Sequence, residues 1–428
     1  MRLGRRPDRA EQSRRQASGK GERAEGPVRE LDQALRRLVL AHQKAEELTM
    51  GKPRLFYVDN LRTMMIIMVI LVHLSVTYGG EGSWYYREGR ADTPTAIVLT
   101  IHNAISQSFF MGLLFLLSAY FTAASCDRKG PGPFLRDRFL RLGIPLLLFE
   151  FVIQPFMIYV LVQGGVIDLR RPFADWLTSY YTRFHLGSGP LWFVEALLIF
   201  SVLYVAWRRL HKPVLGMGDH PGRLPGLNAF LALAALLGIL SFVARLWFPV
   251  NWAFGPLNLQ LAFFVQYIAM FIVGVIAYRR DWLQRLPATV ALPCFLLAGL
   301  LVVVALPLLF VLGGAANGQT WRYLGGPHWQ SFAYAMWEQL FAVVIMVALI
   351  VLFRERFNRQ GRLAQAAASS SYTVYIIHAP IIILFALAIR SLHLYPLLKF
   401  AVAVLVTIPL SFALANVLRQ LPLARRVL

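Results

Sequence analysis

The sequence predicts an all-α integral membrane protein, a bundle of about ten transmembrane helices with both termini in the cytoplasm. Of its 428 residues, 57% are hydrophobic and 15% are charged, and the mean hydropathy is +0.55. A water-soluble domain cannot bury so much apolar surface. Two further observations agree: a series of apolar segments is long enough to cross a bilayer, and Lys and Arg are unevenly distributed between the connecting loops.

Residues 1–56 form a basic segment that we expect to be a largely disordered cytoplasmic tail. This segment carries 14 Lys or Arg residues among many polar ones and almost no aromatic side chain, so it cannot bury a core. Its charge suits contact with anionic membrane lipid. The remaining residues, 57–428, are expected to form one transmembrane domain.

Ten apolar segments follow the tail, and each is long enough to cross a ~30 Å hydrocarbon core as a helix. The loops between them are too short to hold another folded domain. The predicted spans are 62–79, 96–124, 140–163, 190–207, 227–248, 259–278, 290–312, 331–353, 371–390 and 397–418.

The basic residues gather in every second loop, which fixes the expected topology. With the tail in the cytoplasm, the positive-inside rule places these loops on the same side and both termini with them. The clusters are Arg128, Lys129, Arg136 and Arg138; Arg208, Arg209, Lys212 and Arg223; Arg279, Arg280 and Arg285; and Arg354, Arg356, Arg359 and Arg362. Far fewer basic residues lie in the opposite loops.

Charge and cysteine content exclude other classes. A net charge of +21 is typical of nucleic-acid-binding proteins, but the chain has no basic DNA-reading module, and we expect no nucleic-acid partner. Cys126 and Cys294 are the two cysteines, too few for a disulfide framework or a thiolate metal site. We therefore expect neither a bound metal nor a tightly bound cofactor.

Three arginines lie at the cytoplasmic ends of predicted spans. Arg62 lies inside the first apolar segment, where a charge is costly and is retained mainly for function, and Arg138 and Arg141 begin the third. Arginine binds phosphate through paired hydrogen bonds. This cluster is our candidate anion-binding site.

A second set of ionisable residues lies near the outer third of the bundle. His73, His102, Glu195 and Glu338 are each about six or seven residues from the predicted outer face, in four different spans. They indicate a polar chamber open to the outside. Glu150 and His378 are placed deeper towards the cytoplasm, where they could line a connecting tunnel or hydrogen-bond neighbouring helices.

Several of these motifs resemble the membrane acyltransferase 3 family. Residues 57–62, ten intervening residues and His73 are similar to its first span, in which Arg or Lys precedes His by ten residues. The run from Arg138 to Arg141 matches its second basic motif. Residues 109–120 are similar to its second span, with Ala119 where the family usually has glycine. Weaker similarity is found at 191–193 and 371–378, and the resemblance spans about residues 55–420.

The resemblance implies an enzyme that takes an acyl group, with acetyl expected, from cytoplasmic acyl-coenzyme A and transfers it to a hydroxyl of an extracytoplasmic carbohydrate or glycoconjugate. Arg62, Arg138 and Arg141 would bind the phosphates of the donor. His73 would be the base or a transient acyl carrier. We expect Glu195 to orient either His73 or the acceptor hydroxyl. We expect the acceptor to contact four further residues. These are His102, Trp192, Glu338 and His378.

Two alternatives remain open at this level. Ionisable residues inside a membrane also mark transport pathways, so a transporter of a glycan or lipid is the competing class, although no paired broken helices are evident. An acyltransferase acting on an intracellular small molecule is the other. In each case the expected location is the cell membrane, in a bacterium.

Overall fold

The computed structural model describes residues 55–183, 187–211, 224–255, 257–422 and 424. The predicted tail, apart from its last two residues, therefore lies outside the described residues. Residues Phe56–Leu428 form one compact unit. Its described secondary structure is helical, apart from an isolated bridge between Phe254 and Leu259. The all-α prediction is confirmed.

Ten helical segments in the described part of the chain are long and apolar enough to cross a membrane, and each corresponds to a predicted span. Five are single helices: α2 (Phe56–Thr77), α3 (Thr93–Lys129), α9 (Leu227–Arg245), α14 (Trp329–Arg356) and α16 (Pro396–Leu418). Another, α15 (Arg362–Ala388), contains Pro380. Two begin with a short 3₁₀ turn and continue as α8 (Trp192–Leu210) and α10 (Phe264–Arg279). Segment Ala288–Leu312 includes α12 (Ala291–Leu300) and α13 (Leu306–Leu312).

The third span, Pro131–Gln163, is interrupted twice by π-helical turns. It consists of α4 (Pro131–Arg138), α5 (Ile144–Leu148) and α6 (Gln154–Gln163) with turns at Phe139–Gly143 and Phe149–Ile153 between them. Pro145 and Pro155 cannot donate to the carbonyls four residues earlier. Tyrosine hydroxyls replace both bonds, because Tyr372 donates to Arg141 O at 2.6 Å and Tyr181 to Phe151 O at 2.7 Å.

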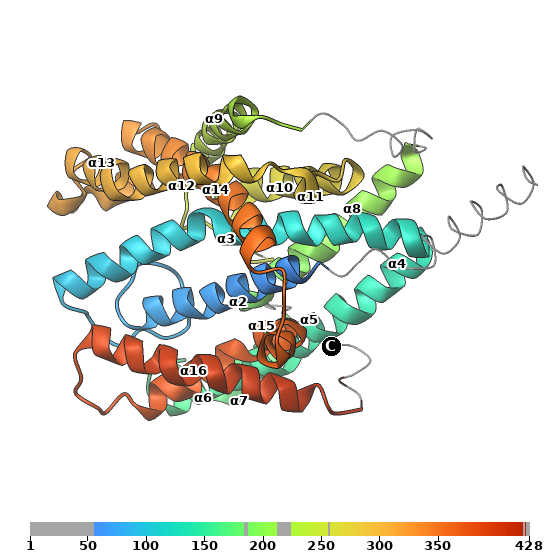
Figure 1. The fold of residues 1–428 in the computed structure, drawn as a ribbon. Helices are drawn as coiled ribbons and strands as arrows, with labels where there is room; N and C mark the ends of the chain where they lie inside the picture. The colour runs from blue at the N-terminus through green and yellow to red at the C-terminus, as the bar shows by residue number, and fades with distance from the viewer. Residues whose placement is uncertain (1–54, 184–186, 212–223, 256, 423, 425–428) are drawn as a thin grey trace, which may run out of the picture. The chain divides into compact units, whose positions relative to one another are not determined.

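Helix α2 lies in the interior of the bundle, between α3 on one side and α15 and α16 on the other (Figure 1). Its buried side chains include Leu61, Met65 and Ile70, none of them exposed. Helix α2 also contacts α14. The helix that carries both Arg62 and His73 is therefore held by four neighbours.

Helices α10 and α3 pack closely against each other. A Cβ on Gly274 would lie 2.2 Å from the carbonyl oxygen of Leu116 and 2.8 Å from the Cβ of Ala119. Small residues allow two membrane helices to approach closely. Gly274 therefore allows α10 to approach α3 closely beside Ala119.

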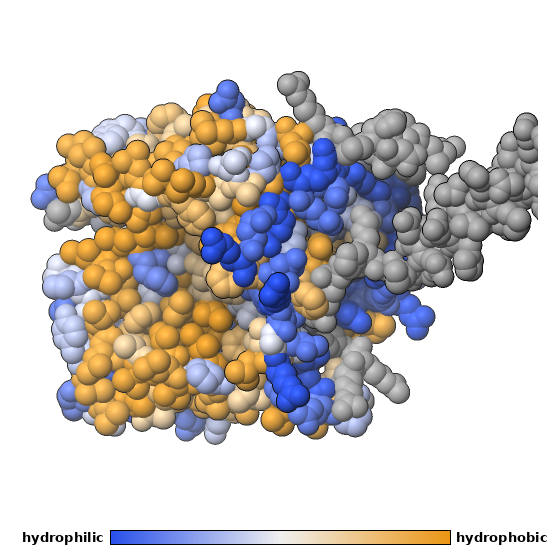
Figure 2. All heavy atoms as spheres, in the orientation of Figure 1, coloured by the Kyte–Doolittle hydropathy of each residue, from blue (hydrophilic) through white to orange (hydrophobic). Residues whose placement is uncertain are grey.

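Large apolar side chains cover the outside of the bundle. Leu405, Val303 and Val311 are each more than 70% exposed. Figure 2 shows apolar residues over most of one face, with hydrophilic residues over the connection from α14 to α15. Such extensive exposed apolar surface is suited to lipid rather than water.

Candidate active site

The three predicted arginines are close together at one end of the bundle. Arg138 ends α4, and its Nη2 donates to Thr122 Oγ1 of α3 at 2.9 Å. Its guanidinium carbon lies 5.1 Å from the centre of the Phe134 ring. Arg62 and Arg141 both interact electrostatically with Arg138, and Arg62 lies 3.9 Å from Asp59. We call Arg62, Arg138 and Arg141 the arginine cluster.

Asn60 fixes the start of α2 against the connection between α14 and α15. Its Nδ2 donates to the carbonyls of Phe357 at 2.7 Å and Arg359 at 3.2 Å, and its Oδ1 accepts from Gln360 Nε2 at 2.9 Å. Two residues later, Arg62 keeps 42% of its side chain exposed. These bonds anchor the first turns of α2, the part of the helix that carries Arg62.

His73, three turns further along α2, contacts two aromatic rings. The Trp84 ring centre lies 3.8 Å from that of His73 with planes 15° apart, and the His378 ring centre lies 5.1 Å away with planes 10° apart. Among the described residues, nothing hydrogen-bonds to the His73 ring. Its nitrogens are therefore available to a reacting group.

His73 lies on the wall of a cavity of about 1150 Å³. Aromatic and amide side chains dominate its polar lining, and none of the arginine cluster is part of it. The lining includes Trp84, Tyr85, Gln107, Gln154, Trp192, Gln260, Tyr267, Tyr334 and Glu338. Pockets that bind small molecules have this combination of apolar walls and a few polar groups.

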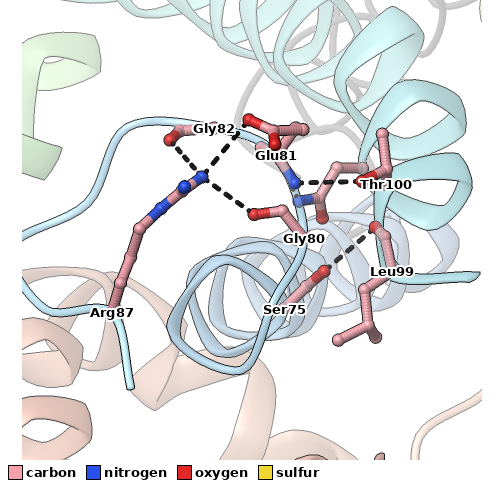
Figure 3. A network of polar contacts seen from close by, with 8 residues as sticks. Ser75, Gly80, Glu81, Gly82, Arg87, Leu99 and Thr100 are labelled. Carbon is pink, nitrogen blue, oxygen red and sulfur yellow. Dashed lines mark hydrogen bonds and ion pairs between the residues drawn. The ribbon is translucent and has the colours of Figure 1, made fainter. Parts of the chain in front are cut away.

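Trp84 reaches His73 because the loop between α2 and α3 folds back onto the helices. Arg87 Nη2 donates to the carbonyls of Gly80 and Gly82, each at 3.0 Å, and lies 3.5 Å from Glu81 Oε2 (Figure 3). Glu81 N donates to Thr100 Oγ1 at 3.1 Å. The loop is thereby tied to α3.

Tyr85 closes the neighbouring part of the cavity wall. Its hydroxyl donates to Gln154 Oε1 at 2.5 Å, and burial raises the pKa of this hydroxyl above its ordinary value, so it stays protonated. A Cβ on Gly189, which has φ +48°, would lie 2.1 Å from the same hydroxyl. Glycine is therefore required at position 189 for this approach.

Three of the predicted residues, Glu195, His102 and His378, do not line the cavity. Glu195 is 8% exposed, and one of its carboxylate oxygens has no hydrogen-bond partner among the described residues. His102 bonds to Asn103 Oδ1 through Nδ1 at 3.2 Å, and its ring faces Phe400 of α16. His378 contacts the His73 ring. The expected role of Glu195, orienting His73 or the acceptor hydroxyl, stays a prediction.

Trp192 and Glu338 line the cavity as expected, but Glu338 is not free. Its Oε2 accepts from Arg245 Nη2 at 2.5 Å and from Gln339 Nε2 at 3.1 Å. Gln266 extends the network, since its Nε2 donates to Gln339 Oε1 at 2.9 Å. Arg245 is 0% exposed. Arg245 was not among the predicted site residues. Like Arg62, however, it is a charged residue inside a predicted span.

Comparison with known proteins identifies the family of this chain. A family model described as an acyltransferase domain, Acyl_transf_3, matches residues 55–416. The chain belongs to the acyltransferase 3 family. The predicted resemblance is thus confirmed over most of the chain, and the ten apolar helices are those of a multi-pass membrane protein.

Similar members of the acyltransferase 3 family include proteins named glucans biosynthesis protein C. Those of Shigella dysenteriae serotype 1 and Escherichia coli K12 are each 23% identical over 342 residues, which cover 78% of this chain and 83% of each relative. The protein from Escherichia coli O6:K15:H31 is 22% identical over 346 residues. No solved structure matches the chain.

The buried ion pair between Arg245 and Glu338 gives a stability prediction for this acyltransferase 3 protein. Glu338→Leu should lower the free energy of unfolding by ~3–5 kcal/mol, because an unpaired guanidinium would remain in the interior. The double variant Glu338→Leu with Arg245→Met should recover most of that loss. Thermal unfolding in detergent measures both.

The matched control for this pair is Ser331→Ala. Ser331 is also buried in α14, and its hydroxyl has no partner among the described residues, so its loss should change stability little. An unfolding temperature of the single Glu338→Leu variant equal to that of the wild-type protein would contradict the importance of the pair.

Proposed function

We propose that this protein moves an acyl group, with acetyl expected, from acyl-coenzyme A to a hydroxyl of an extracytoplasmic carbohydrate or glycoconjugate. One observation carries the proposal. Helix α2 has Arg62, next to two further arginines, at one end, and His73 on the wall of a large cavity eleven residues later. That spacing corresponds to a rise of about 16 Å.

The arginine cluster is suited to the donor. Guanidinium groups bind phosphates through two parallel hydrogen bonds, and three together would bind the phosphates of coenzyme A. The pantetheine arm would then extend beside α2 and bring the thioester to His73. We place the arginine cluster and both termini on the cytoplasmic side, in agreement with the distribution of basic loops.

His73 supplies the base. Its imidazole takes the proton of the acceptor hydroxyl as the hydroxyl oxygen bonds to the thioester carbonyl carbon. The carbon–sulfur bond then breaks, and the proton passes from His73 to the departing thiolate. The products are the acylated acceptor and free coenzyme A. In the alternative route, His73 first carries the acyl group on a ring nitrogen.

The cavity supports a carbohydrate acceptor. Trp192 stacks with Tyr267, with centres 5.4 Å apart and planes 26° apart, next to the amide side chains of the lining. Flat rings pack on the apolar faces of sugars, while amides bond to their hydroxyls. Since the relatives are named for glucan biosynthesis, glucans are the first acceptors to test.

Sealed proteoliposomes test the proposal. Purified protein is reconstituted in one orientation, with labelled acetyl-coenzyme A on the arginine side and an impermeant glucan or other envelope glycan on either side. We expect labelled glycan only when it is opposite the donor. Labelling of acceptors on the donor side would favour an intracellular small molecule, and movement of unlabelled glycan without acylation would favour a transporter.

A further inference from the structure

His378 was expected to lie deeper in the membrane than His73, but the two rings lie together. Three ring-centre distances define the arrangement: 3.8 Å from His73 to Trp84, 5.1 Å from His73 to His378 and 6.2 Å from Trp84 to His378. These distances place Trp84 and His378 in directions about a right angle apart at His73. Trp84 covers a face of the His73 ring, so His378 lies beside its edge.

The tautomer of His378 follows from its own hydrogen bond. Its Nδ1 lies 2.7 Å from the carbonyl oxygen of Tyr375, which can only accept, so Nδ1 carries the proton. Nε2 of the neutral ring is therefore an acceptor. Pro380, two residues later, leaves the carbonyl of Ile376 without its helix donor and loosens this turn of α15.

Nε2 of His378 has no partner among the described residues, although the side chain is 0% exposed. A buried acceptor without a hydrogen bond is costly, and most such groups in folded proteins are paired. The ring beside His378, with its plane 10° from that of His378, is His73, which carries one N–H when neutral. The two ring planes are only 10° apart, so an N–H on the near edge of His73 would lie close to the plane of the His378 ring.

We infer that His378 is the positioning residue for His73: its Nε2 accepts the N–H of His73 during the reaction. This inference rests on the proposed function. The bond leaves the other nitrogen of His73 unprotonated towards the cavity, which is the form a base requires. It also stabilises the imidazolium that forms when His73 takes the hydroxyl proton, the role an aspartate has in catalytic triads.

Two amide variants separate this role from a structural one. The amide of glutamine reaches the place of Nε2, so His378→Gln keeps an acceptor for His73 but loses the bond to Tyr375. The amide of asparagine reaches only the place of Nδ1, so His378→Asn keeps the Tyr375 bond and loses the acceptor. If the role of His378 is purely structural, asparagine should be the better replacement. If His378 positions His73, glutamine should be the better replacement.

The first measurement is steady-state acyl transfer by the full chain in detergent, with acetyl-coenzyme A and the acceptor found active in proteoliposomes. His378→Asn should lower kcat about 10- to 100-fold with little change in either KM, and His378→Gln should stay near wild type. Thr373→Val is the control, because Thr373 is buried on the same helix and lies outside the cavity lining. Equal kcat values for Asn and Gln, or a lower value for Gln, would overturn the inference.

The second measurement needs no substrate. Diethyl pyrocarbonate acylates unprotonated imidazole nitrogen, and mass spectrometry of the peptide with His73 gives the rate. This rate should fall in His378→Asn and not in His378→Gln, and identical rates would contradict the inference. If the wild-type protein transfers no acyl group, the proposed function fails, while the reactivity of His73 still decides the role of His378.

Discussion

Replacing His73 by alanine is expected to lower acyl transfer by about 100- to 10,000-fold, the usual effect of removing a general base. The side chain lies on the wall of the cavity, and no hydrogen bond of its ring among the described residues would be lost with it. The variant should therefore fold, insert and bind acyl-coenzyme A like the wild-type protein. Steady-state transfer from labelled acetyl-coenzyme A, measured with thermal unfolding, tests this.

The control for this prediction is His393→Ala. His393 is exposed in the connection between α15 and α16, and its loss should leave turnover unchanged. Turnover near the wild-type value in the His73 variant would show that His73 is neither the base nor the acyl carrier, and the inference about His378 would lose its basis.

The second large effect is expected at the arginine cluster. Glutamine in place of Arg62, Arg138 or Arg141 should each weaken acyl-coenzyme A affinity by about 10- to 100-fold, because hydrogen bonds between charged groups are the strong ones. Lysine should restore only part of the affinity, since it has a point charge without the planar fork. Titration calorimetry with coenzyme A measures each change directly.

Arg356→Gln is the matched control for the arginine variants. Arg356 ends α14 and is exposed near the same end of the bundle, so its loss should have little effect on donor binding. Acceptor KM should be unchanged in all three cluster variants. Unchanged coenzyme A affinity in all three would remove the cluster from the donor site.

The sequence predicted the ten spans and the grouping of the arginines, because both depend on position along single helices. Apolar runs of sufficient length have few alternatives to a membrane helix. The first and third spans begin on the same side of the membrane. The arginines near their starts, Arg62, Arg138 and Arg141, are therefore expected at the same end of the bundle. The structure adds that α2 begins at Phe56 and α15 at Arg362, several residues before the apolar runs.

Contacts between elements were harder to predict. The depth of His378 was counted along its own span, but the tilt and rotation of a membrane helix are set by packing, and these bring its ring to His73. Trp84 contacts His73 because its loop is hydrogen-bonded to α3, and no pattern in the sequence predicts that contact. Glu338 and Arg245 are separated by 93 residues, and nothing local in the sequence pairs them.

One continuous helix, α2, carries both Arg62 and His73, so the distance between these two residues is fixed by the helix itself. Neighbouring helices can shift without changing a rise of about 16 Å between these two residues. Under the proposed function, this fixed distance matches the length of coenzyme A from its phosphates to the thioester. It does not depend on the acyl chain beyond the thioester. Specificity for the acyl group is then set by the cavity walls around Trp84, and it can change while α2 stays the same. Inserting one residue between Arg62 and His73 would instead turn the imidazole by about 100° and remove it from His378.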